Sequence, residues 1–229
     1  MNNLNAPGAR FLSGIDVSSY QRTVDWTAVA GSGIQFCYIK ATEGSSCADH
    51  GFAQHWRRAG ETGLARGAYH FFHPTMPVTT QANFFLHTVG EPQPGDLPPA
   101  LDLEAPEEWV GIPAAARAAL AIKWLEIVET RLNLAPIVYL SPAFMIETLR
   151  NASALGRYRL WLAEYTSAAA PRVPSPWTAW TFWQHMGKGR VPGVALPVDL
   201  NWFNGTAGDL QALAVAAPQI SPVPPVVAS

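Results

Sequence analysis

The stretch Pro98-Pro-Ala-Leu-Asp-Leu-Glu-Ala-Pro106 places two carboxylates one residue apart at the end of an apolar run. Side chains of a β-strand alternate between its two faces, so Asp102 and Glu104 would point the same way while the two leucines enter the core. The closing proline ends the strand, because it cannot donate to a central sheet ladder. The spacing therefore predicts a strand over 97–104 that carries two acids at its carboxyl end.

Seven further apolar runs of strand-like length recur along the chain, and several precede a segment with helical spacing. The expected strands are 11–17, 33–40, 64–72, 135–140, 159–164, 178–184 and 196–200. The expected helices are 49–60, 79–89, 112–132 and 141–149, with none between the last strands. Strands that alternate with helices predict a parallel sheet. The expected fold class is α/β, a single-domain TIM-like β/α barrel of eight strands with about five outer helices.

The two ends of the chain differ in composition from the middle. Residues 1–10 contain neither a charged n-region nor an apolar h-region, so no Sec signal peptide is expected there. The end of the chain, 212–229, is rich in Pro, Ala and Val, which disfavour helix and central strand. The sequence thus predicts an N-terminal tail at 1–10, a barrel domain at 11–211 and a C-terminal tail at 212–229.

Composition limits the classes of partner. A hydrophobic content of 48% and a charged content of 14% are typical of a globular protein with a large core. The net charge of −2 provides no basic surface for nucleic acid, and no apolar run approaches the ~18 residues of a membrane span. Metal-binding spacings such as H-E-x-x-H or C-x-x-C are missing, so neither a metal nor a cofactor is expected.

Two histidines and two cysteines lie near expected strand ends. His70 and His73 are interpreted as hydrogen-bonded strand-end residues rather than metal ligands. Cys37 falls within an apolar strand and Cys47 in the loop that follows. A bond between these cysteines is disfavoured, because free cysteine in an apolar run most often packs as a small core residue.

Further acids fall at the ends of other expected strands. Catalytic residues of β/α barrels lie at the carboxyl ends of strands. This rule selects Asp16 on the first strand and Asp199 on the last, which are neighbours in a closed barrel. Together with Asp102 and Glu104 they would face one mouth and raise one another's pKa, which keeps an acid protonated near neutral pH. A protonated acid beside an ionised carboxylate is the pair that glycosidases use.

Several segments together resemble a known family. In order, they are 14–21 (GIDVSSYQ), 38–44 (YIKATEG), 67–71 (GAYHF), 101–104 (LDLE), 138–141 (VYLS), 160–165 (LWLAEY), 183–184 (WQ), 191–193 (VPG) and 198–201 (VDLN). This set resembles glycoside hydrolase family 25, the Chalaropsis-type lysozymes or N-acetylmuramidases found in phage lysins and bacterial autolysins. The resemblance spans residues 11 to about 205.

The resemblance implies hydrolysis of the β-1,4 bond between N-acetylmuramic acid and N-acetylglucosamine in peptidoglycan. By the same matching, Glu104 is the general acid, while Asp102 either attacks the sugar as a nucleophile or orients its N-acetyl group. Asp16 and Asp199 would complete the catalytic set. The residues expected to bind substrate are Tyr69, Tyr139, Trp161, Gln184 and Glu43.

This interpretation also implies a partner and a place of action. The partner is bacterial peptidoglycan, and the protein is expected to be a monomer that does not insert into a membrane. It would be made in the cytoplasm and reach the wall through a holin-type pore or a specialised route. Two alternatives stay open: a catalytically silent glycan-binding barrel, and a chitinase-like N-acetylhexosaminidase that uses the same two acids.

Overall fold

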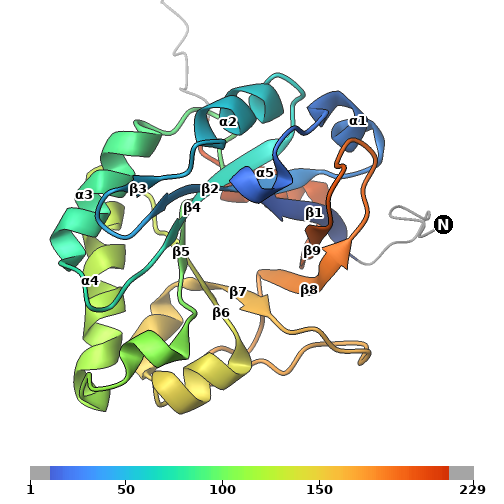
Figure 1. Cartoon of the computed structure of the whole chain (residues 1–229). Helices are drawn as coiled ribbons and strands as arrows, with labels where there is room; N and C mark the ends of the chain where they lie inside the picture. The colour runs from blue at the N-terminus through green and yellow to red at the C-terminus, as the bar shows by residue number, and fades with distance from the viewer. Residues whose placement is uncertain (1–10, 217–229) are drawn as a thin grey trace, which may run out of the picture.

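The computed structural model describes residues 11–216, so the expected tail at 1–10 and the part of the other tail beyond 216 lie outside it. Within this range, one sheet closes into a barrel in the order β1-β9-β8-β7-β6-β5-β4-β2, and β1 pairs with β2 (Figure 1). The expected eight-stranded barrel is confirmed. Its strands are β1 (Leu12–Val17), β2 (Phe36–Glu43), β4 (Ala65–Phe71), β5 (Ala100–Asp102), β6 (Ile137–Leu140), β7 (Arg159–Ala163), β8 (Phe182–Gly189) and β9 (Val198–Phe203). A short strand, β3 (Cys47–Ala48), extends β2 as a hairpin.

The last strand runs against both of its neighbours, so the expectation of a purely parallel sheet is wrong for β9. This strand pairs antiparallel with β8 and with β1, whereas the other neighbouring pairs around the barrel are parallel. The connection explains the reversal. Residues 190–197 alone join β8 to β9, and a parallel crossover needs roughly a dozen residues or more.

Aromatic rings fill the inside of the barrel. The buried rings are those of Phe36, Tyr38, Trp161, Phe182 and Phe203. Two glycines make room for them. A Cβ atom on Gly14 would lie 2.3 Å from the ring of Phe36, and one on Gly67 would lie 2.3 Å from the ring of Tyr38. Close packing of this kind makes the interior a solid core, so a ligand can enter only at the ends of the barrel.

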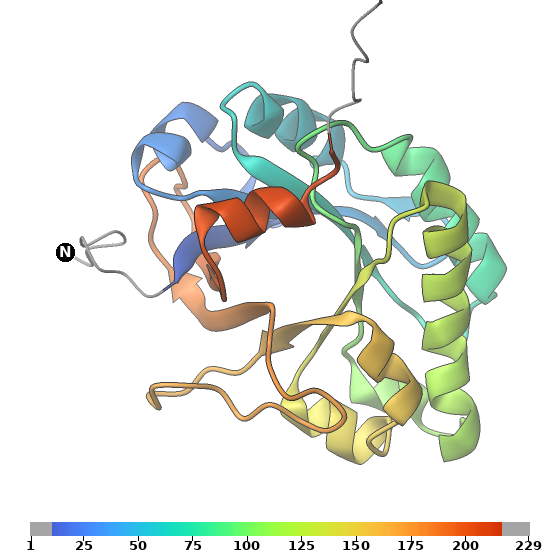
Figure 2. The same cartoon turned by 180° about the vertical axis from the view of Figure 1, so that it is seen from behind.

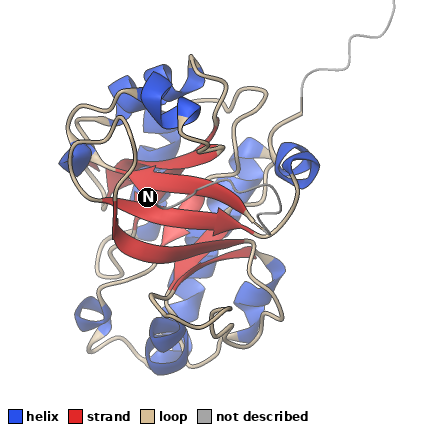
Figure 3. Cartoon of the chain, turned by 90° about the vertical axis from the view of Figure 1, so that its right-hand side faces the viewer, coloured by secondary structure: helices blue, strands red, loops and turns tan. Residues whose placement is uncertain are grey.

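Three helices cover the outside of the parallel strands, and they match expected helices. They are α2 (Phe52–Gly60), α3 (Val78–Val89) and α4 (Ala114–Leu132). Figure 3 shows helices on both sides of the central strands. Buried rings join the layers: His70 on β4 stacks on Trp124 of α4 with centroids 5.3 Å apart, and Trp124 in turn lies 5.2 Å from Phe85 of α3.

The expected helix at 141–149 is present in an altered form. The hydroxyl of Ser141 accepts a hydrogen bond from the backbone N–H of Phe144 at 3.1 Å, so this serine caps the segment as predicted. The turns that follow form a short π-helix, η3 (Phe144–Thr148). Three 3-10 helices complete the connections: η1 (Ser19–Gln21), η2 (Pro106–Trp109) and η4 (Ser153–Arg157).

Two short helices were not expected, α1 (Trp26–Gly31) and α5 (Ala207–Leu213). Each begins with a side-chain cap but is too short to show a clear apolar period. Leu210 of α5 packs among the interior aromatic residues, and Figure 2 shows this helix in red across the back of the barrel. The helix crosses the expected domain boundary at residue 211, and the division into tails and barrel stays a prediction.

Two properties of the described chain bear on its setting. Among residues 11–216, no helix has the length and apolar character that a membrane crossing requires. Both cysteines are free thiols, with Cys37 buried in β2 and Cys47 exposed in β3.

Candidate active site

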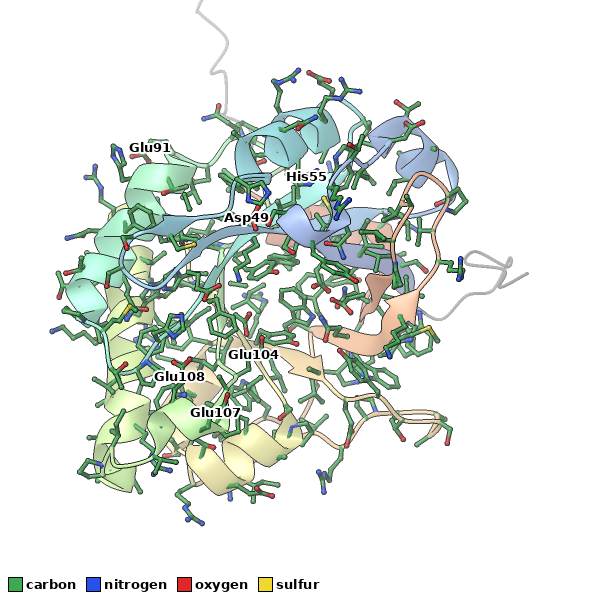
Figure 4. The ribbon with its side chains drawn as sticks, in the orientation of Figure 1. Asp49, His55, Glu91, Glu104, Glu107 and Glu108 are labelled. Carbon is green, nitrogen blue, oxygen red and sulfur yellow. The ribbon has the colours of Figure 1, made fainter. Side chains whose placement is uncertain are left out.

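The mouth of the barrel contains a hollow of about 180 Å³, here called the acid cleft. Figure 4 shows Glu104 near the centre of this mouth. The structure brings together eight of the nine predicted site residues here, and it adds Tyr165. The lining residues are Asp16, Tyr69, Asp102, Glu104, Tyr139, Trp161, Tyr165, Gln184 and Asp199.

The two acids of the opening motif differ in their surroundings. β5 ends at Asp102, so the prediction of a strand through Glu104 is too long by two residues. Asp102 is 6% exposed, and among the described residues its Oδ1 atom has no hydrogen-bond partner. Ala105 adopts a left-handed conformation with φ 54°, and this bend separates the strand from η2. Glu104 lies just before the bend and is exposed.

Both acids hold their protons more tightly than usual. Burial and the nearby charge of Glu104 raise the pKa of Asp102 well above its ordinary value. Desolvation by the cleft walls and the charge of Asp16 raise the pKa of Glu104, although Lys40 acts in the opposite direction. Raised pKa values of this kind allow a carboxylic acid to donate a proton near neutral pH.

A second acid pair joins the first and last strands. Asp16 and Asp199 are directly opposite in the β1–β9 register. Because β9 runs in reverse, Asp199 reaches the mouth from the start of its strand and not from the end, as the sequence suggested. The carboxylate of Asp16 accepts hydrogen bonds from the side chains of Gln184 at 3.0 Å and Asn201 at 2.7 Å. Burial and the charge of Asp16 raise the pKa of Asp199 to about 8.

This pair predicts a pH-dependent loss of stability that Asp199→Asn should relieve. The folded protein keeps the Asp199 proton up to about pH 8, whereas the unfolded chain releases it near the ordinary value of 3.8. Stability should therefore fall as pH rises between these values. The asparagine amide can imitate the protonated acid by donating to Asp16. We expect the variant to have a higher Tm at pH 8, by about 2–4 °C, and a smaller difference at pH 5. Thermal unfolding at both pH values tests this, and an equal gap at both would contradict it.

Hydrogen bonds between hydroxyl, amide and indole groups fix the orientation of the side chains at the base of the cleft. The Oε1 atom of Gln184 accepts hydrogen bonds from the hydroxyls of Tyr139 at 2.9 Å and Tyr165 at 2.7 Å. The indole N–H of Trp161 donates to Asn201 at 2.7 Å. The family resemblance includes Asn201 in the segment 198–201 but implies no role for it. Asn201 lies two residues after Asp199 on a strand, and this spacing predicts that both side chains are on the same face.

Tryptophan is mainly a core residue in this chain. Trp161 is 2% exposed, and its ring lies 4.6 Å from Tyr38 and 4.8 Å from Tyr139, between centroids. It therefore supports the cleft from below and exposes little surface to a sugar. Tyr165, which is 61% exposed, presents a more accessible ring at the rim.

Glu43 is the one predicted site residue that does not line the acid cleft. Its carboxylate accepts hydrogen bonds from Lys40 at 2.5 Å and contacts Nε2 of His73 at 3.1 Å. His70 is buried and hydrogen-bonded by Thr42 and Gln81, as interpreted from the sequence. Among residues 11–216, no group of three His, Cys, Asp or Glu side chains is arranged to hold a metal ion.

A second hollow of about 270 Å³ adjoins the acid cleft and is here called the η3 hollow. It shares Glu104 and Tyr139 with the cleft and continues over β6 and η3. Its polar lining includes Ser141 and Glu147, and the exposed Glu147 carboxylate has no ion-pair partner among the described residues. Glu104 thus stands at the boundary between two adjoining spaces.

An accessible acid with a raised pKa at the boundary of two hollows, beside buried carboxyl groups in a barrel mouth, is the arrangement expected of a glycoside hydrolase site. The model of the glycosyl hydrolases family 25 matches residues 15–194, and the chain belongs to this family. The expected resemblance and the expectation of a glycoside hydrolase are both confirmed.

Individual relatives support the assignment. The chain is 39% identical to the protein YegX of Escherichia coli K12, an uncharacterized protein, over 91% of this chain and 75% of that one. It is 33% identical to Lysozyme M1 of Streptomyces globisporus, over 89% and 71%. The crystal structure of the bacterial lysozyme from Streptomyces coelicolor superposes with a TM-score of 0.85 at 33% identity, covering 89% of this chain and 96% of that chain.

Proposed function

We propose that this protein is a lysozyme that hydrolyses the β-1,4 bond between N-acetylmuramic acid and N-acetylglucosamine in bacterial peptidoglycan. Membership of family 25 and the similarity to lysozymes support this activity. The observation that carries the proposal is the position of Glu104, an accessible acid with a raised pKa between the acid cleft and the η3 hollow. The enzyme acts as a monomer on the wall, after it leaves the cytoplasm where it is made.

Glu104 donates its proton to the glycosidic oxygen as the bond breaks, and it later removes a proton from the attacking water. Asp102 stabilises the positive charge that develops on the sugar ring. Asp102 lines the acid cleft together with Glu104, and a carboxylate there can accept a hydrogen bond from the N–H of a substrate acetamido group. We therefore assign to Asp102 the orientation of the N-acetyl group, whose oxygen attacks the anomeric carbon. Direct attack by Asp102 is the competing role.

The two hollows differ in their lining, and this difference indicates which sugar binds in each. A general acid protonates the oxygen between two sugars, so it must lie where their binding sites meet. The sugar that becomes positively charged belongs among carboxylates, which places N-acetylmuramic acid in the acid cleft. The leaving N-acetylglucosamine then occupies the η3 hollow, beside Ser141 and Glu147.

This placement of the two sugars predicts a defect in Glu147→Ala that depends on the leaving group. Loss of a charged hydrogen bond to a sugar hydroxyl costs about 1.5 kcal/mol or more, which is roughly tenfold in kcat/KM. We expect that loss on soluble peptidoglycan strands and the same activity as wild type on a muramyl substrate with an aryl leaving group. Equal loss on both substrates would place Glu147 outside the leaving-sugar site.

The reaction itself is tested by mass spectrometry of peptidoglycan digested with the protein and reduced with borohydride. A muramidase produces reduced muramic acid ends. Reduced glucosamine ends would show a glucosaminidase, and digestion of chitin oligomers in place of peptidoglycan would favour the chitinase-like alternative. Binding to the wall without any new reducing end would support the catalytically silent barrel.

A further inference from the structure

A cluster of charged residues next to the acid cleft joins three elements of the barrel mouth. The imidazole of His73 lies between two carboxylates, with Nδ1 at 2.5 Å from Glu108 and Nε2 at 3.1 Å from Glu43. The other oxygen of Glu43 accepts from Lys40 at 2.5 Å. Glu43 and Lys40 lie on β2, His73 follows β4, and Glu108 lies on η2. We call these four residues the His73 cluster.

The backbone of His73 is held in place by a buried side chain. The Oε1 atom of Gln81 accepts from the His73 N–H at 3.0 Å, and its Nε2 atom donates to the His73 carbonyl at 2.8 Å. Gln81 is 0% exposed and belongs to α3. The backbone of His73 is therefore fixed to α3, and the ring of His73 connects Glu108 and Glu43 to this helix.

The segment that carries Glu108, η2, begins two residues after the acid Glu104. Glu108 comes four residues after Glu104, and the Glu108 N–H bonds to the carbonyl of Ala105 at 3.0 Å, which makes the turn compact. The left-handed Ala105 gives the chain its bend between Glu104 and η2. Figure 4 shows Glu107 and Glu108 on the outer side of Glu104, in the same part of the view. Fixing Glu108 thus fixes the end of the turn from which Glu104 projects.

We propose that His73 is a positioning residue for the general acid, tying η2 to β2 through Glu108 and Glu43 so that Glu104 keeps its place between the two hollows. This role deepens the proposed function and rests on it. Only the doubly protonated imidazole can donate to both carboxylates, because the neutral ring has one N–H. Loss of that proton releases one of the two carboxylates and leaves the His73 cluster with one net negative charge.

The surroundings of His73 favour the protonated form. The ring is partly buried, which opposes its charge, but the hydrogen bonds and charges of Glu108 and Glu43 prevail and raise its pKa. Outside the cluster, the titratable groups that face it are the neutral, buried His70 on β4 and the cleft acids Asp102 and Glu104, whose charges interact with those of Glu43 and Lys40. The stabilisation of the cluster by the charged His73 ring should be complete below about pH 6.5. It should disappear as the pH rises through the raised pKa of His73.

The first experiment compares His73→Gln with wild type and with His87→Gln, which changes an exposed histidine of α3. Kinetics on soluble peptidoglycan strands are measured from pH 5 to 9. Misplacement of a reacting group by ~1 Å can cost about 100-fold, and the buried Trp109 still anchors η2, so we expect His73→Gln to lower kcat by about tenfold. KM should change by less than about twofold, because the hollows themselves are unaltered. Wild-type kcat and pH profile in His73→Gln would overturn the proposal.

The second experiment uses Glu108→Gln, which keeps a hydrogen-bond acceptor for Nδ1 but removes its charge. The pKa of His73, measured by histidine NMR titration, should fall, and the alkaline loss of kcat should move to lower pH with it. Activity at pH 5 should stay close to wild type. A fall in the His73 pKa without any shift of the activity profile would refute the positioning role. This variant also decides the question if His73→Gln does not fold.

The absence of lysozyme activity and the absence of the positioning role of His73 give different experimental results. A folded wild type that releases no reducing ends would refute the lysozyme activity. The His73 cluster would then be judged by amide hydrogen exchange across residues 104–109. Faster exchange there in His73→Gln than in His87→Gln supports the tie between β2 and η2, and unchanged exchange refutes it.

Discussion

Glu104→Gln is expected to lower kcat on peptidoglycan by about 10²–10⁴-fold, the contribution typical of a general acid. The amide has the size of the acid but cannot donate a proton to a leaving oxygen. The fold should survive, since the Glu104 side chain is exposed and makes no hydrogen bond that holds the described chain together. Thermal unfolding should therefore give a Tm within about 2 °C of wild type.

Glu91→Gln is the matched control for this experiment. Glu91 is exposed just after α3, and Figure 4 shows it on the outer helical layer, far from the mouth. The same chemical change at this position should leave kcat and KM unaltered. Turnover by Glu104→Gln at the level of Glu91→Gln would remove Glu104 from the mechanism and point to another acid of the cleft.

Asp102→Asn is expected to reduce kcat by about 10²–10³-fold, the scale of losing one electrostatic contact to the transition state. Asp102 is buried, and its crowding by Glu104 raises its pKa, so its charged form is costly in the free enzyme. Neutral asparagine removes that cost. We therefore expect a Tm equal to or above that of wild type together with the loss of activity. Activity within threefold of wild type would contradict any chemical role for Asp102.

The two roles considered for Asp102 differ in the effect of azide on Asp102→Ala. If Asp102 attacks the sugar directly, azide can enter the vacated space and form an α-glycosyl azide, restoring turnover. If the N-acetyl group attacks and Asp102 only orients it, azide should form no such product. The second result is favoured because Glu104 borders both hollows and Asp102 lines only the acid cleft, which leaves Glu104 alone facing the scissile oxygen. Mass spectrometry and NMR of the reaction products distinguish the two.

Local pattern was enough to predict the parallel part of the barrel. Strands that are buried on both faces appear as short apolar runs, and the helices α2, α3 and α4 have clear apolar spacing. The short helices α1 and α5 gave no such signal, because a helix of two turns is determined by its caps and its tertiary contacts. The reversed direction of β9 could have been predicted from its short connection to β8.

The acids of the candidate site could be predicted from one rule, that catalytic residues of β/α barrels lie at the ends of strands. Strand-end position selected Asp16, Asp102, Glu104 and Asp199, although Asp199 reached the mouth by the opposite strand direction. The rule could not predict the contact of His73 with Glu43 and Glu108. Those residues lie 30 and 35 positions away along the chain. These residues meet only because the folded barrel brings β2, the end of β4 and η2 together, so no local sequence pattern predicts their contact.

The pairing of β1 with β9 also determines when the site comes into being. Asn201 and Asp16, which hydrogen-bond across this seam, are 185 residues apart along the chain. Contacts of such long sequence separation form late in folding, since the intervening loop must first be closed. A chain emerging from the ribosome has no complete cleft until its last strand is inserted between β8 and β1. A chain that ends before β9 lacks both Asp199 and Asn201, and therefore has neither the second acid pair nor the hydrogen bond that holds Asp16.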